Sequence, residues 1–215
     1  MREERITTGR RARYYTLGGD GGATSAWIVC HGFGQLGVRF AADFAPVASP
    51  TRLIVVPEAL NRFYLTTASD GSHGDARVGA TWMTREDREA EIADYVDYLE
   101  AVRAATVAED VPLTALGFSQ GVATVCRWVA LGARPVQRLI LWAGQIPPDV
   151  DLAAIAGRVA EPLIVVHGTK DEHAQWMQME AMHERLATAG VRAEIRTFEG
   201  GHRMDRGVLG ALAPG

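Results

Sequence analysis

The sequence contains little cysteine, with two such residues among 215. Cys30 and Cys126 stand far apart, and neither lies at a metal-ligand spacing from another cysteine or histidine. A zinc site and a disulfide framework are therefore not implied. Cys30 falls in a predicted strand and Cys126 in a predicted helix, where a free thiol behaves as a small apolar side chain. We expect both thiols to be buried.

An excess of positive charge and a long apolar run are also absent. The 22 Lys and Arg residues against 26 Asp and Glu give a net charge of -4, which offers no long-range attraction to nucleic acid or anionic lipid. No apolar stretch approaches the roughly 20 residues that span a membrane, and the charged first residues lack the apolar segment of a secretory signal. We expect one cytoplasmic domain over residues 1–215; no signal indicates an oligomeric state.

Short apolar runs alternate with helical patterns along the chain. Nearly continuous apolar runs are typical of strands buried on both faces of a sheet. Strands are predicted at residues 13–17, 26–30, 53–56, 113–116, 139–142, 163–167 and 193–198. Helices are predicted at residues 39–48, 85–106, 122–131, 152–158 and 174–189. Strands separated by helices predict an α/β fold with a mostly parallel central sheet covered by helices on both faces.

Local signals add detail to this order. The glycine-dense turn at 17–23 predicts a hairpin between the strands at 13–17 and 26–30. Thr84, with Asp87 three residues later, is a candidate N-cap for the helix at 85–106. Residues 59–81 show no clear period, and loops of this length are usually functional or disordered. We therefore consider residues 61–80 a candidate lid or pocket loop.

The sequence Gly-Phe-Ser-Gln-Gly at 117–121 joins a predicted strand to a predicted helix. This is the context of the GxSxG nucleophile elbow, in which a sharp turn lifts the serine hydroxyl clear of the backbone. Glycine at both ends of the motif lets the strand and the helix pass closely. Ser119 is therefore the candidate nucleophile. The alternative is a glycine-rich turn that holds a serine without a catalytic role.

Polar residues follow several predicted strands, and ligands of parallel sheets gather at the carboxyl ends of the strands. A serine nucleophile needs a base, and an imidazole base needs a carboxylate to orient it. Asp171 and His202 each follow a predicted strand, so we predict a catalytic triad of Ser119, Asp171 and His202. The rivals are Asp149 and Asp151 for the acid, and His31, His73, His167, His173 and His183 for the base.

Acyl transfer also needs donors for the oxyanion of its intermediate. The backbone amides of Gln120, directly after the serine, and Phe33, in a glycine-flanked turn, are the candidate oxyanion hole. Apolar side chains usually line ligand pockets. The candidates for substrate binding are Phe63, Tyr64, Trp82, Trp142 and Ile146. The alternative is that these aromatic side chains only cover the core.

Five motifs together resemble the phospholipase/carboxylesterase branch of the α/β-hydrolases, which includes small bacterial carboxylesterases and acyl-protein thioesterases. They are His31-Gly32-Phe33-Gly34, the 117–121 elbow, Ile146-Pro147, Gly168-Thr169-Lys170-Asp171 and Gly201-His202. The resemblance covers roughly residues 27–209. It implies an α/β-hydrolase fold, the triad and oxyanion hole named above, and a position for Trp82 near the acyl pocket.

Two segments depart from the family pattern near the expected substrate groove. Residues 83–87 replace an aspartate-containing run, and residues 142–145 replace a smaller Ser-Gly pair, so acyl preference does not carry over. We expect a serine hydrolase that cleaves small-molecule esters or thioesters through an acyl-enzyme, without metal or organic cofactor. The same constellation also fits an acyltransferase, a perhydrolase, or a catalytically silent binding protein.

Overall fold

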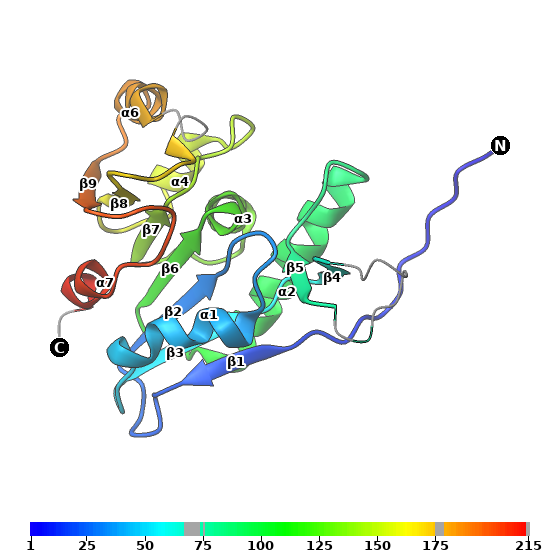
Figure 1. Ribbon diagram of the computed structural model, residues 1–215, viewed down its shortest axis with the longest axis horizontal. Helices are drawn as coiled ribbons and strands as arrows, with labels where there is room; N and C mark the ends of the chain where they lie inside the picture. The colour runs from blue at the N-terminus through cyan, green and yellow to red at the C-terminus, as the bar shows by residue number, and fades with distance from the viewer. Residues whose placement is uncertain (67–73, 75, 175–178, 214–215) are drawn as a thin grey trace.

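A seven-stranded sheet forms the centre of the computed structural model, which describes residues 1–66, 74, 76–174 and 179–213 (Figure 1). The strand order is β1-β3-β2-β6-β7-β8-β9, and every neighbouring pair is parallel except β1 with β3. The strands are β1 Tyr14–Leu17, β2 Ser25–Cys30, β3 Arg52–Pro57, β6 Leu113–Phe118, β7 Arg138–Trp142, β8 Leu163–Gly168 and β9 Ala193–Phe198. The predicted α/β fold is confirmed.

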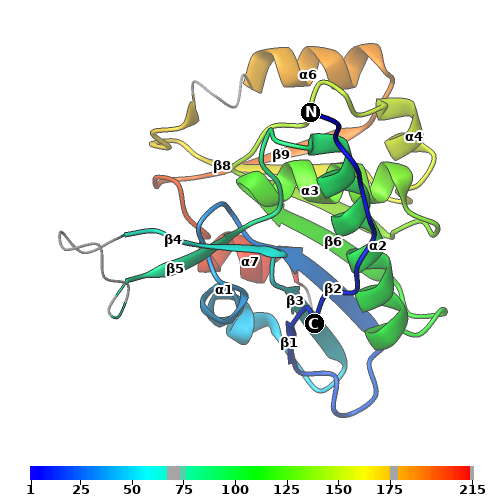
Figure 2. The ribbon, with the colours of Figure 1, turned by 90° about the vertical axis from the view of Figure 1, so that its right-hand side faces the viewer.

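Helices cover both faces of this sheet (Figures 1 and 2). They are α1 Gly37–Phe44, the 3-10 helix η1 Ala45–Val47, α2 Arg88–Thr106, α3 Gln120–Leu131, α4 Leu152–Ala156, α6 Met179–Thr188 and α7 Arg206–Leu212. Within the described residues, no helix is long and apolar enough to cross a membrane. Helix α7 was not predicted, although Asp205 caps it by accepting from the amides of Gly207 and Val208.

Alternating side chains of the strands build two apolar layers. In β2, Ile28 and Cys30 pack in the cluster that includes α2 and α3, whereas Trp27 and Val29 pack in the cluster that includes α1 and α7. Burial on both faces explains why the strands read as continuous apolar runs. Cys30 and Cys126 are both free and buried, as expected.

The first strand pairs differently from the prediction. The predicted hairpin between residues 13–17 and 26–30 does not form. Instead, β1 pairs antiparallel with β3, from Tyr14 opposite Pro57 to Leu17 opposite Ile54. The glycine-rich turn is held to the segment that leads into β3, where the amide of Gly19 donates to the Ser49 carbonyl at 2.9 Å. Gly18, at φ 68°, lies so close to Ser49 that a Cβ would come within 2.5 Å of its carbonyl oxygen.

The segment between β3 and α2 also holds structure that the sequence did not predict. The strands β4 Asn61–Tyr64 and β5 Val78–Thr81 form a two-stranded antiparallel sheet that projects beside the main one (Figure 2). The two ends of the candidate lid at 61–80 are therefore paired strands. Residues 67–73 and 75, between them, lie outside the described residues. The N-cap prediction was wrong: α2 begins at Arg88, and the preceding Asp87 is left-handed with no side-chain cap.

A close backbone crossing joins β6 to α3. A Cβ added at Gly117 would lie 2.3 Å from the carbonyl oxygen of Gly121, and one added at Gly121 would lie 2.1 Å from the carbonyl oxygen of Cys30 in β2. Real Cβ atoms do not approach so closely, and backbone cannot yield as a flexible side chain does. Both positions therefore require glycine for α3 to start where it does.

We predict that Gly121→Ala lowers the free energy of unfolding by about 1–3 kcal/mol, because β2 and α3 must separate to admit the methyl group. Gly210→Ala, in α7 with open space around its Cβ position, is the matched control and should stabilise by about 0.5–1 kcal/mol through helix propensity. Urea unfolding of both variants checks this. Equal changes in unfolding free energy for the two variants would show that the backbone does not need glycine at position 121.

Candidate active site

Ser119 occupies the turn between β6 and α3. Its backbone has φ 53° and ψ -117°, one of three positive-φ non-glycine residues within the described chain, and such strain clusters at functional sites. The Ser119 amide donates to the carbonyl of Trp142 at 2.9 Å, which fixes the turn against β7. The side chain does not cap the helix that it precedes. The half-buried hydroxyl thus stands at the N-terminus of α3, as the elbow motif predicts.

Asp171 and His202 meet across the loops that follow β8 and β9. His202 Nδ1 lies 2.9 Å from Asp171 Oδ2, and the carboxylate side chain is fully buried while the imidazole side chain is 16% exposed. The other carboxylate oxygen accepts from the amide of His173 at 2.8 Å. Since an ionised carboxylate only accepts, His202 Nδ1 carries the proton in this pair and Nε2 is left as the basic nitrogen.

The two loops approach through a glycine. A Cβ at Gly168 would lie 2.2 Å from the carbonyl oxygen of Gly200, so any larger residue would separate the loops that hold Asp171 and His202. The His202 ring packs on the ring of Phe118 with centroids 5.0 Å apart, and Phe118 directly precedes Ser119. Ser119, Asp171 and His202 therefore all lie at the carboxyl end of the sheet, as expected from their positions after predicted strands.

The rival acids have other partners. Asp149 accepts from Arg127 at 2.9 Å on both of its oxygens, and it also pairs with Arg88 at 2.8 Å. The hydrogen bonds from Arg127, with those from Arg88, hold the pKa of Asp149 far below its usual range. Asp151 caps α4 by accepting from the amide of Ala153. Neither carboxylate is the one bonded to His202.

Among the rival bases, His31 is fully buried and bonded to backbone at both nitrogens. Its Nδ1 lies 2.8 Å from the carbonyl of Gly32, and its Nε2 accepts from the amide of Ala59 at 3.0 Å. Burial lowers the pKa of His31, so the ring stays neutral and ties two loops together. His73 lies outside the described residues. His173 is exposed, yet its ring meets that of His202 edge-on at 4.6 Å, a contact that the sequence did not indicate.

The candidate oxyanion hole lies beside the nucleophile. A Cβ at Gly32 would lie 3.1 Å from the Cβ of Ser119, so the turn that contains Phe33 passes directly against the elbow. Within the part of the chain that the structure describes, the amides of Phe33 and Gln120 donate no hydrogen bond. Both donors therefore remain available to an oxygen atom at this point.

The side chain of Gln120 has a role that sequence reasoning missed. Its Oε1 accepts from the amide of Trp82 at 3.2 Å, and its Nε2 donates to Thr81 Oγ1 at 2.8 Å and to the carbonyl of Met83 at 3.1 Å. The elbow is thereby fastened to the end of β5. The glutamine of the Gly-Phe-Ser-Gln-Gly motif was the available signal, but its partners come from a segment without recognisable periodicity.

Glu58 is a second residue that the sequence did not single out. Its fully buried carboxylate accepts from Arg13 and Arg62 at 2.7 Å each, and from the amide of Gly37 at the start of α1 at 3.1 Å. Burial alone would raise the pKa of Glu58, but the hydrogen bonds and charges of Arg13 and Arg62 together lower it. Glu58 therefore anchors α1, the helix that follows the turn containing Phe33.

The five predicted substrate-binding residues divide into two groups. Trp82, Trp142 and Ile146 are at most 1% exposed, and the indole N–H groups of Trp82 and Trp142 donate to the carbonyls of His31 and Arg203. These three residues pack in the core, and the two indoles position site loops. Phe63 and Tyr64, by contrast, reach the surface: Tyr64 is 50% exposed.

An exposed aromatic side chain lies beside this second group. Phe33 is 60% exposed, and its ring stacks on Phe63 with centroids 5.1 Å apart. Phe33 and Phe63 therefore form an apolar rim on the turn at residues 31–34. No group of three His, Cys, Asp or Glu side chains that could hold a metal occurs among the residues described.

Comparisons with known proteins bear on the family and the fold of this chain. The sequence matches the family model described as phospholipase/carboxylesterase over residues 18–213, and no curated protein matches it. Esterase PE8 aligns with a TM-score of 0.68 at 20% identity over 95% of this chain and 97% of that chain. Acyl-protein thioesterase 2 of Zea mays gives 0.66 at 16% over 94% and 96%, and a carboxylesterase from Mesorhizobium loti gives 0.69 at 19% over 94% and 93%. At these identities the likeness shows the fold.

For Glu58→Gln we predict a loss of about 1–3 kcal/mol in unfolding free energy at pH 7, because two arginines lose their charged acceptor. A lowered folded-state pKa stabilises above the unfolded value of about 4.3, and this contribution disappears as the pH falls through the folded value. The difference from wild type should therefore shrink below about pH 4. Urea titrations from pH 7 to pH 3.5 test this, with exposed Glu184→Gln as control. A difference independent of pH would contradict it.

Proposed function

The chain belongs to the phospholipase/carboxylesterase family, and we propose that it is a serine hydrolase that cleaves carboxylic esters, and thioesters, through an acyl-enzyme. The observation that carries the proposal is the 2.9 Å contact between the buried carboxylate of Asp171 and Nδ1 of His202. A buried carboxylate on that nitrogen leaves Nε2 free to accept a proton and stabilises the imidazolium that results.

In the first step, the Ser119 hydroxyl attacks the substrate carbonyl and gives its proton to His202 Nε2. The carbonyl oxygen becomes an oxyanion, which the amides of Phe33 and Gln120 bind. Removal of one such donor typically costs about 10²- to 10³-fold in rate. The proton then passes from His202 to the leaving alcohol or thiol as the carbonyl–leaving group bond breaks, and the acyl group stays on Ser119.

In the second step, water replaces the leaving group. His202 takes a proton from the water as its oxygen attacks the acyl carbon, and the same amides bind the new oxyanion. Collapse of this intermediate returns the proton to Ser119 and releases the carboxylic acid. Asp171 remains ionised throughout, because its role is to hold the ring and its charge. The chemistry uses only side chains and backbone of this chain.

The substrate class follows from the rim of the site. The ring of Phe33 is 60% exposed and contacts that of Phe63 with centroids 5.1 Å apart, and this apolar pair is the proposed contact for the acyl group of the substrate. A small apolar acyl ester is therefore the substrate that this surface favours over a strongly charged one.

The proposal predicts that Ser119→Ala lowers turnover of p-nitrophenyl esters by at least about 10³-fold, with the fold retained. Wild type, Ser119→Ala and the control Ser25→Ala, at the opposite end of the sheet, are compared on acetate, butyrate and octanoate esters and on a butyryl thioester. Ser25→Ala should keep wild-type rates. Wild-type rates in Ser119→Ala would refute the serine mechanism. Acyl transfer to added alcohols in place of hydrolysis would identify a transferase.

A further inference from the structure

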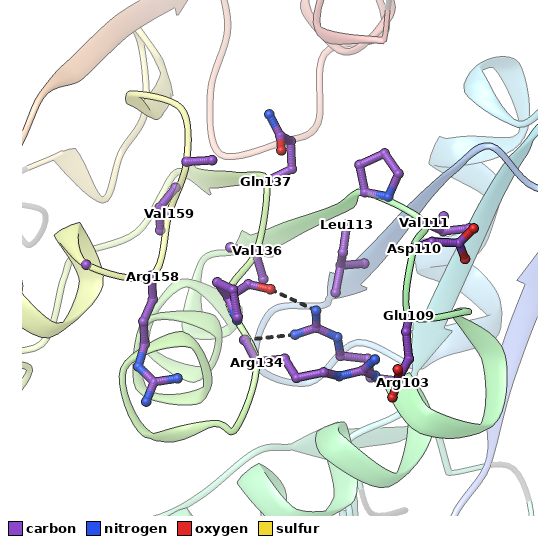
Figure 3. Close-up of a pocket in the computed structure, with 14 residues that line it drawn as sticks. Arg103, Glu109, Asp110, Val111, Leu113, Arg134, Val136, Gln137, Arg158 and Val159 are labelled. Carbon is purple, nitrogen blue, oxygen red and sulfur yellow. Dashed lines mark hydrogen bonds between the residues drawn. The ribbon is translucent and has the colours of Figure 1, made fainter.

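A pocket of about 470 Å³ opens at the amino ends of strands β6 and β7 (Figure 3). It is lined by residues around the start of β6, such as Leu113, and by the segment at 134–137 that leads into β7. Ser119 follows the other end of β6. Six residues of strand, at about 3.3 Å each, separate the two ends by roughly 20 Å. The pocket is therefore distinct from the candidate active site.

Arg103 of α2 extends into this pocket. Arg103 is only 6% exposed. Its two terminal nitrogens donate to the carbonyls of Arg134 and Pro135 at 2.9 and 2.7 Å (Figure 3). Its Nε is buried without a hydrogen-bond partner. A guanidinium has five N–H donors, so these two carbonyls leave part of its capacity unused.

The charge of this arginine also lacks a directly paired carboxylate among the described residues. Within the described residues, neither Arg103 nor Arg134 forms an ion pair. Burial lowers the pKa of Arg103, the neighbouring positive charge of Arg134 lowers it further, and the negative charge of Glu100 offsets only part of these effects. A buried cation without a counter-ion costs stability, and a second cation beside it adds repulsion. Arg158, which also lines the pocket, instead donates to the carbonyl of Gly132.

We propose that this pocket binds the phosphate group of a small phosphorylated compound, with Arg103 and Arg134 as its cationic ligands. A phosphate monoester carries close to two negative charges at neutral pH, which match two arginines, and guanidinium groups bind its oxygens with good geometry. The apolar lining of Val111, Val136 and Val159 accommodates a hydrocarbon body attached to the phosphate. Glu109 and Asp110, also on the lining, oppose such an anion.

Phenyl phosphate is the probe that tests this site, by isothermal titration calorimetry in phosphate-free buffer of low ionic strength. Wild type should show saturable binding at one site. Arg134→Gln should weaken it by about tenfold or more, the range for a lost charged hydrogen bond. Glu109→Gln should strengthen it. Arg11→Gln, which removes an equal charge from an exposed position away from the pocket, is the matched control and should leave the dissociation constant unchanged.

Two further binding measurements test whether the anion binds away from Ser119 and whether the site prefers a phosphate group. Protein whose Ser119 has been blocked by a fluorophosphonate should still bind phenyl phosphate, and benzoate, with one charge, should bind more weakly. The absence of saturable binding, equal affinity in Arg134→Gln, or loss of binding on blocking Ser119 would each overturn the proposal. Benzoate affinity equal to that of phenyl phosphate would overturn the assignment to a phosphate group.

Discussion

The close passage of β6, α3 and β2 constrains the rest of the structure. Gly117 and Gly121 leave no room for a Cβ, and the turn between them holds Ser119 at φ 53°. A non-glycine residue in such a conformation costs on the order of 1–3 kcal/mol, so the surrounding contacts must enforce it. The amide of Ser119 bonded to Trp142 is one such contact. Stability is thus given up locally to place a hydroxyl at a helix N-terminus.

Neighbouring strands complete the site because all of them end at the same edge. The loop after β2 lies against Ser119, and the loops after β8 and β9 join through Asp171 and His202. Buried groups outside the proposed chemistry hold these loops: Gln120 binds the end of β5, Glu58 binds the start of α1, and Trp142 binds the carbonyl beside His202. The proposed reaction depends on the close positioning of its reacting groups, and these attachments restrict the movement of the loops that carry them.

Local patterns predicted the parts that depend on local physics. Continuous apolar runs gave the parallel strands, and the family resemblance stated from five motifs agrees with the family-model match over residues 18–213. Pairing partners were harder, because the edge position of β1 depends on bonds from Gly19 to Ser49 rather than on its own sequence. The β4–β5 sheet was not predicted, because each of its strands has only four residues and therefore shows little periodicity. Burial of Trp82 and Trp142 in the core is likewise set by distant partners, which residue type alone does not reveal.

In the proposed mechanism the buried carboxylate of Asp171 orients the imidazole of His202 for the serine, whereas the carboxylate of Asp149 stabilises the fold through Arg127 and Arg88. Parallel measurement of turnover and thermal midpoint in Asp171→Asn and Asp149→Asn separates the two roles. The account predicts that Asp171→Asn loses about 10⁴-fold in kcat with a small change in midpoint. Asp149→Asn should keep kcat near wild type and lower the midpoint, because Arg127 and Arg88 lose their ionised partner. Near-normal turnover in Asp171→Asn would contradict the account.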